Sequence, residues 1–93
     1  MVARMSRRFR NGAGELAPKL ILPPVIQDEM RKRLAGVEEA PHATELEARR
    51  REALGVVRGL EIAVALEAAR IERLYILIDD VASARGLELE QEG

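Results

Sequence analysis

Asp79 and Asp80 are the adjacent pair in this chain whose residue types best suit acid–base or metal chemistry. Two carboxylates share a proton or hold one metal ion only when their oxygens reach the same point. Neighbouring residues of a helix point about 100° apart, so these two carboxylates diverge. No histidine lies near them in the sequence. We therefore expect a solvated polar strip here, or a salt bridge to an arginine of a partner.

The other nucleophilic and basic side chains stand apart from one another in the sequence. His42 has neither a cysteine nor a second histidine to pair with, and Ser6 and Ser83 lie outside any nucleophile motif. Tyr75 falls at the edge of an apolar stripe, where a tyrosine commonly packs its ring and hydrogen-bonds its hydroxyl. We expect no catalytic residue, no cofactor and no metal ligand, and hence a protein that is not an enzyme.

Two groups of arginines suit an anionic partner. The first, Arg49, Arg50 and Arg51, spreads around a helix and is neutralised locally by Glu45, Glu47 and Glu52. The second lies in a basic N-terminal arm and is better placed to follow a phosphate backbone or an acidic protein surface. It comprises Arg4, Arg7, Arg8 and Arg10. Its alternative role is that of a solvated terminus.

Charge is unevenly distributed along the 93 residues, whose net charge is −1. Residues 1–19 carry five basic residues and one acidic residue, whereas residues 44–93 carry seven basic and eleven acidic residues. The absence of cysteine excludes disulfides and fits a reducing compartment. Residues 1–10 lack the apolar core of a secretory signal, and no uncharged apolar run reaches the roughly 20 residues of a membrane span. We expect a soluble cytoplasmic protein, or a virion-associated one if a phage encodes it.

Residues 1–23 predict an extended arm that is first basic and then rich in proline. Pro18, Pro23 and Pro24 forbid a helix between them, and residues 20–22 are apolar on both faces of an extended run. Such a segment needs an apolar groove to lie in. We expect it either to strap the protein's own helices or to cross a neighbouring subunit.

The rest of the chain predicts an all-α fold. A short helix at about residues 24–37 begins at Pro24, which suits a first helical turn. A long helix at residues 44–85 begins with a capping box of Thr44 and Glu47 and stops at Gly86. Gly55 and Gly59 lie inside it and predict a bend, or a break that would make three helices. Residues 24–86 form the helical domain, and residues 87–93 an acidic tail.

The long helix carries an apolar seam with alternating steps of three and four residues, which is typical of coiled coils and helical bundles. From residue 60 to residue 81 its apolar surface covers most of the circumference. A helix of that kind needs two or more neighbours, and the first helix is too short to cover it. We therefore predict a homo-oligomer or a larger protein partner. The predicted helix-packing interface comprises Val57, Leu60, Val64, Ile71, Leu74 and Ile78.

These features predict a non-enzymatic structural or adaptor subunit that assembles through the long helix, as in a virion or another multi-subunit machine. An alternative arises because a strand at residues 19–23 followed by two helices resembles the ribbon-helix-helix family over residues 18–59. That resemblance implies a DNA-binding dimer whose paired strands read the major groove. The sequence departs from the family where it offers Leu20, Ile21 and Leu22 in place of polar, base-reading side chains.

Overall fold

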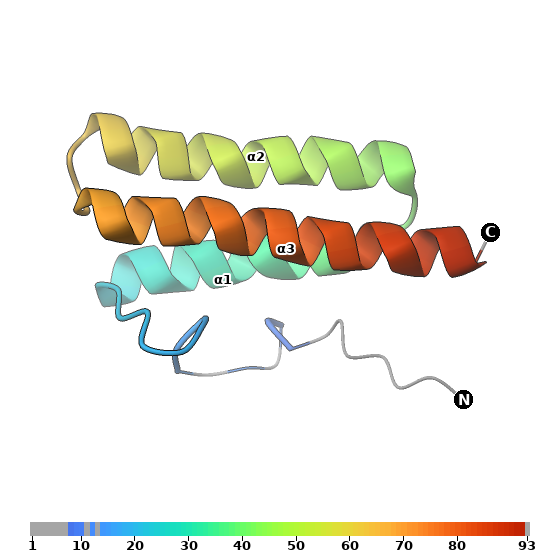
Figure 1. The fold of residues 1–93 in the computed structure, drawn as a ribbon, viewed down its shortest axis with the longest axis horizontal. Helices are drawn as coiled ribbons and strands as arrows, with labels where there is room; N and C mark the ends of the chain where they lie inside the picture. The colour runs from blue at the N-terminus through green and yellow to red at the C-terminus, as the bar shows by residue number, and fades with distance from the viewer. Residues whose placement is uncertain (1–7, 11, 13, 93) are drawn as a thin grey trace.

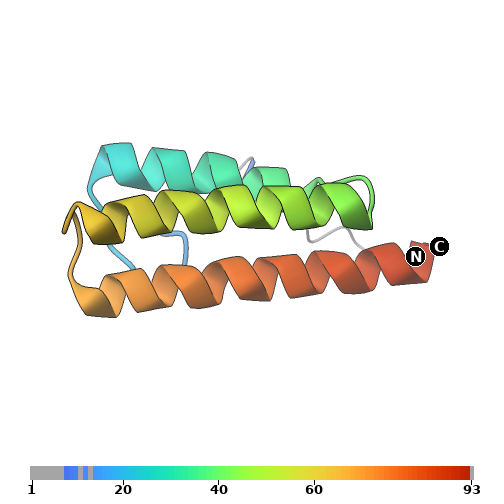
Figure 2. The ribbon, with the colours of Figure 1, turned by 90° about the horizontal axis from the view of Figure 1, so that it is seen from above.

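The computed structural model describes residues 8–10, 12 and 14–92. These residues form three helices, α1 (Pro24–Glu38), α2 (Ala43–Ile62) and α3 (Ala68–Glu92), and no strand. The helices lie side by side along the long axis, and α2 runs opposite to α1 and α3 (Figures 1 and 2). The all-α helical bundle that the sequence predicts is therefore confirmed.

The first helix begins and ends close to its predicted bounds. Pro24 occupies the first helical position, where its missing N–H costs no hydrogen bond. Met30, Leu34 and Val37 recur at spacings of three to four and are fully buried. Gly36 lies inside the helix, and α1 ends at Glu38, three residues before Pro41. The amphipathic period thus decides which face of α1 packs on the other helices.

The second helix begins one residue before its predicted bound at residue 44. Ala43 is its first residue, and the ring of His42 caps it, because Nδ1 accepts a hydrogen bond from the N–H of Glu45 at 3.3 Å. The predicted Thr44–Glu47 capping box is wrong, since the Glu47 carboxylate instead binds Arg50 and Arg51. His42 therefore has a structural role as a helix cap.

The long helix predicted at residues 44–85 is not continuous, because the chain reverses at residues 63–67. A break gives the three helices of the alternative prediction, although it does not fall at Gly55 or Gly59. The N–H of Val64 donates to the carbonyl of Glu61 at 3.1 Å, and the N–H of Ala65 donates to that of Leu60 at 2.9 Å. These two bonds make a Schellman motif, which ends helices around a residue with left-handed backbone. That residue is usually glycine, but here it is Val64, with φ of 54°. No glycine marks the break, so the sequence pattern hides it.

The glycines that were expected to shape the long helix do not do so. Gly55 and Gly59 lie inside α2, and a Cβ added at either would meet open space. Gly86 was expected to stop the helix, yet α3 continues to Glu92, so residues 87–92 of the predicted acidic tail belong to the helix. Leu89 is half-buried, which gives this last part of α3 an apolar residue to pack.

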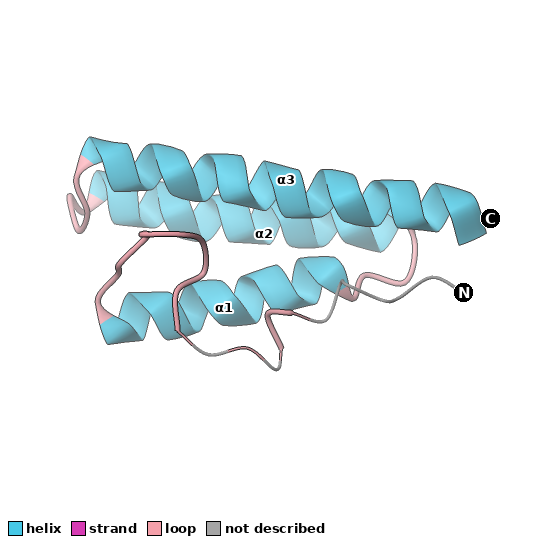
Figure 3. Ribbon diagram, turned by 60° about the horizontal axis from the view of Figure 1, so that its bottom comes forward, coloured by secondary structure: helices cyan, strands magenta, loops and turns pink. Residues whose placement is uncertain are grey.

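The Pro-rich segment is a strap over the protein's own helices and lies along α1 and α3 (Figure 3). Leu20 and Leu22 are buried while Ile21 between them is 63% exposed, which is the alternation of an extended run. On one side, the Gln27 amide of α1 donates to the carbonyl of Gly14 at 2.9 Å. On the other, Arg73 of α3 donates to that of Pro18 at 2.8 Å. The strand that the ribbon-helix-helix resemblance implies is absent from residues 19–23.

The core lies where the three helices and the strap meet. Leu20 from the strap, Leu34 from α1, Val57 from α2 and Leu74 from α3 are all at most 1% exposed. The strap and each of the three helices therefore contribute fully buried side chains to one core. Among the residues described, no helix is long and apolar enough to cross a membrane.

Candidate partner-docking site

Most residues of the predicted helix-packing interface are buried inside this chain. Val57, Ile71, Leu74 and Ile78 are buried in the core between the chain's own helices, and Leu60 is half-buried. The reversal at residues 63–67 folds the second half of the predicted seam back onto the first. Of the six residues, Val64 alone is exposed, at 82%. Most of the apolar surface that seemed to need a partner is therefore covered by α1, α2 and the strap.

The exposed apolar surface instead gathers at one end of the bundle, which we call the apolar end. At this end α1 starts, α2 stops and α3 starts (Figures 1 and 2). Four large aliphatic residues belong to it and are 63–82% exposed: Ile21, Val25, Ile62 and Val64. The other exposed large apolar residues of the described chain, Ile76 and Leu87, lie further along α3. Large exposed apolar patches mark binding surfaces more often than single exposed residues do.

Val64 carries two unfavourable features at once. A β-branched residue rarely takes a left-handed backbone conformation, because its Cβ substituents crowd the neighbouring carbonyl. Its side chain is also largely in water, so no packing inside the chain offsets that strain. Strained residues concentrate at functional sites, where the strained geometry serves an interaction.

The apolar end is supported from beneath by buried and hydrogen-bonded side chains. Leu66 of the α2–α3 loop turns inward and is 7% exposed. The hydroxyl of Tyr75 on α3 donates to Oε1 of Glu61 on α2 at 2.9 Å, which confirms the expected hydrogen-bonded tyrosine. This hydrogen bond raises the pKa of the Tyr75 phenol above its ordinary value of 10.0. The loop is therefore held firmly between α2 and α3.

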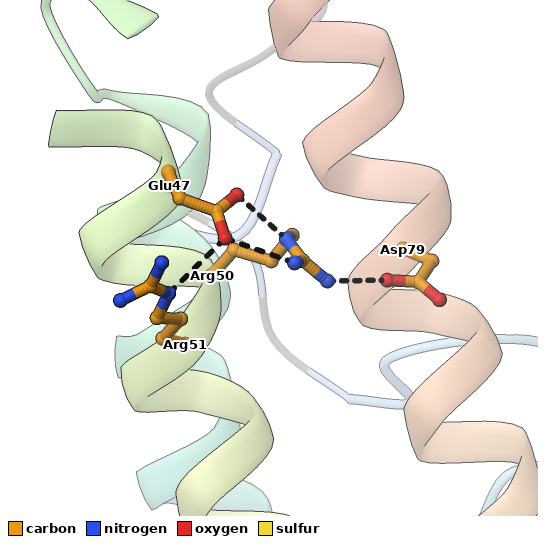
Figure 4. A network of polar contacts seen from close by, with 4 residues as sticks. All are labelled: Glu47, Arg50, Arg51 and Asp79. Atoms are coloured by element: carbon orange, nitrogen blue, oxygen red, sulfur yellow. Dashed lines mark hydrogen bonds and ion pairs between the residues drawn. The ribbon is translucent and has the colours of Figure 1, made fainter. Parts of the chain in front are cut away.

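Asp79 of the predicted Asp79–Asp80 pair belongs to an ion-pair network that joins two helices. The Asp79 carboxylate points to α2, where its Oδ1 lies 3.3 Å from Nη1 of Arg50 (Figure 4). Arg50 also donates to Glu47 at 3.0 Å, and Arg51 donates to the same carboxylate at 3.2 Å. The hydrogen bond from Arg50 is the main reason that the pKa of Glu47 lies below its ordinary value. This network connects α2 to α3, and it leaves Arg50 and Arg51 paired with acids, as the sequence indicates.

The basic arm is only partly described. Arg4 and Arg7 lie outside the described residues. The Arg8 guanidinium stacks on Phe9, 4.4 Å from the ring centroid, and Arg10 pairs with Glu39 of the α1–α2 connection. Two of the four predicted anion-binding residues are thus placed, and one of them is already neutralised by an acid. The proposed contact with an anionic partner stays a prediction.

A groove of about 460 Å³ lies between the arm and α3 and contains two buried charged residues, Glu38 and Arg85. Both serve the fold. Glu38 accepts a hydrogen bond from the N–H of Phe9 at 3.2 Å. Arg85 donates to the carbonyl of Ala40 at 2.9 Å and to Glu88 at 2.8 Å. Neither buried side chain has an unsatisfied polar atom to offer a ligand, and the sequence pattern had singled out neither one.

The sequence alone identifies the residues of the apolar end as apolar, but it does not show that they lie together. Ile62 is apolar and lies outside the seam, but a continuous helix would have buried it against a partner along its side. Val25 belongs to the apolar stripe of α1, and Ile21 to the extended strap. What brings these residues to one end is the reversal after Ile62, which no glycine or proline announces. Antiparallel packing then sets the start of α1 beside it.

Within the described part of the chain, no group of three or more histidine, aspartate or glutamate side chains is arranged to hold a metal ion. Comparisons with protein-family models, with curated proteins and with solved structures find no match to this chain. The apolar end therefore has to be interpreted from its own chemistry.

Proposed function

We propose that this chain is a non-enzymatic structural or adaptor subunit that joins a larger macromolecular assembly through the apolar end of its bundle. The observation that carries the proposal is the pairing of exposure and strain at the α2–α3 connection. Ile62 is 73% exposed and Val64 is 82% exposed, with a left-handed backbone at Val64. A chain selected for stability alone would place a glycine or a polar residue at that turn.

The energy available from this surface is large enough to direct binding. Burying one large aliphatic side chain stabilises by about 1.5–3 kcal/mol, so the four residues, roughly three-quarters exposed, offer about 5–9 kcal/mol together. The loss of translational and rotational freedom on association costs about 4–15 kcal/mol. The apolar end therefore suits the centre of a larger contact, surrounded by polar interactions that exclude water.

The proposal is tested by affinity capture with matched surface variants. The purified full chain is immobilised and exposed to native extract, alongside Ile62→Ser and Ile76→Ser. Both substitutions replace an exposed isoleucine on a helix, so neither should unfold the chain, which circular dichroism will verify. We expect a partner to be retained by the wild type and by Ile76→Ser but lost by Ile62→Ser. Equal retention by all three proteins would refute a role for the apolar end.

A further inference from the structure

We infer that the groove between the arm and α3 is a docking site for residues 1–7 of the same chain, which thereby extend the contact of the strap along α3. The groove lies away from the apolar end, so the inference does not depend on the proposed function. Its volume is about 460 Å³, and one stripe of α3 lines it with Leu77, Val81 and Ala84. Grooves with an apolar lining and a few polar groups are typical binding sites.

The arm reaches this groove directly from its contact with the core. Four apolar side chains between residues 9 and 22 are buried in the core: Phe9, Leu16, Leu20 and Leu22. The N–H of Phe9 donates to Glu38, and both Glu38 and Arg8 line the groove. Because consecutive residues are bonded, the chain that precedes Arg8 starts at the groove. Docking of residues 1–7 there continues an interface that already exists.

Residues 1–7 are long enough to cover the groove. The α3 stripe from Leu77 to Glu88 extends about 17 Å, at 1.5 Å per residue of helix. Seven extended residues span up to about 25 Å. The segment can therefore follow the whole stripe.

The apolar residues of this segment suit the lining of the groove. Met5 is the first apolar residue before Phe9, and Val2 lies three positions further back. Methionine is unbranched and flexible, so it fills irregular apolar surfaces. Burial of Met5 against the α3 stripe would add one more apolar contact to the series that Phe9 belongs to.

The charges are complementary over the complete lining of the groove. Apart from Arg8, which belongs to the arm, the lining comprises three acids and one base: Glu38, Asp80 and Glu88, and Arg85. Residues 1–7 contain two arginines and no acid. Arg85 already donates to Glu88 and to the carbonyl of Ala40. Asp80 is exposed and forms no ion pair with a described residue, so it is the carboxylate best placed to receive Arg4 or Arg7.

Docking of the arm makes the groove an internal competitor for the anionic partner that the sequence predicts. An arginine that pairs with Asp80 has to leave this carboxylate before it can bind a phosphate or an acidic protein surface. The groove therefore controls when the arm is available.

Disulfide formation in the full chain tests the inference, because the natural sequence has no cysteine. One variant carries Met5→Cys with Ala84→Cys, and its matched control carries Met5→Cys with Ser83→Cys. Ala84 and Ser83 are both small and exposed, but adjacent helical residues point about 100° apart and only Ala84 lines the groove. A disulfide requires Cα atoms within about 7 Å of each other. Equilibration with a glutathione redox buffer at low protein concentration, followed by non-reducing gels and mass spectrometry, gives the effective concentration of the two thiols. Circular dichroism verifies that each variant folds.

We expect the effective concentration of the Ala84 pair to be about tenfold above that of the Ser83 pair, since burial of one large apolar side chain shifts an equilibrium by at least that factor. Equal effective concentrations in the two pairs overturn the inference. A disulfide that forms mainly between two chains also overturns it, because the groove would then hold the arm of a second copy.

Two aspartate variants of the Ala84 pair test the ionic contact. Asp80→Asn should lower the effective concentration about two- to fivefold. Asp79→Asn should leave it unchanged, because the Asp79 carboxylate points to Arg50 on α2. Equal effects of the two substitutions overturn the pairing of the arm with Asp80.

Discussion

Replacing Val64 by glycine should stabilise the protein although it removes an apolar side chain. Left-handed backbone costs an L-residue roughly 1–2 kcal/mol, because its Cβ crowds the carbonyl oxygen, and glycine escapes this cost. Val64 is 82% exposed, so little packing is lost. The greater freedom of glycine in the unfolded chain offsets about 0.4–1 kcal/mol. We expect a net gain of about 0.5–1 kcal/mol, equivalent to a rise of roughly 2–8 °C in Tm for a domain of this size.

Urea and thermal unfolding, followed by far-ultraviolet circular dichroism, measure this gain. Val64→Ala is the matched control, since alanine retains the Cβ that causes the crowding while also removing the apolar branches. It should therefore gain less than Val64→Gly. If glycine destabilises the protein, or gains no more than alanine, then the side chain of Val64 stabilises the isolated fold and the argument from strain fails. Combined with weaker partner retention, a stabilised Val64→Gly protein would separate binding from folding at this one residue.

Three further outcomes follow from the same contacts. Gly59→Ala should raise the free energy of unfolding by about 1 kcal/mol, because Gly59 lies within α2 and an added Cβ would meet open space. A lower free energy of unfolding in urea would contradict this prediction. Leu20→Ala should cost about 2–5 kcal/mol and Ile21→Ala less than 1 kcal/mol, since their side chains are 1% and 63% exposed; equal losses would mean that the strap does not pack as described. The hydrogen bond from Arg50 lowers the pKa of Glu47 in the folded protein. The ionised Glu47 carboxylate therefore stabilises the fold fully at pH values above its ordinary pKa of 4.5, and this stabilisation is lost as the pH falls through the lowered pKa of the folded state. The stability difference between wild type and Glu47→Gln should therefore shrink in acid, and a pH-independent difference in urea unfolding would refute the assignment.

The sequence by itself determined the fold class and most of the packing residues. Met30, Leu34 and Val37 follow the helical period and are fully buried, because an amphipathic stripe leaves a short helix one way to face the core. Val57, Leu74 and Ile78 are buried for the same reason. A salt bridge from Asp79 to an arginine was also expected, but its partner is Arg50 of the same chain.

The reversal after Ile62 was decided by tertiary structure. Helix propensity and apolar period both favour continuation through residues 62–66, and the αL residue of the Schellman motif is a valine instead of the usual glycine. Packing α3 against α2 and α1 buries Ile71, Leu74 and Ile78. The burial of these three side chains stabilises the fold by more than the left-handed backbone of Val64 destabilises it. Local pattern could not anticipate this, because the gain comes from residues far apart in the sequence.

The same reversal decides what kind of surface the protein offers. A continuous helix would have exposed a long apolar side and demanded other chains along it, as the period predicts. Folded back, the chain covers that side with α1, α2 and the strap, whose Leu20 and Leu22 are buried in the core. The apolar surface that remains is the end of the bundle. The sequence determined how much apolar surface the chain must bury, and tertiary structure decided which part stays available for a partner, because only packing brings α1, α2 and the strap to one place.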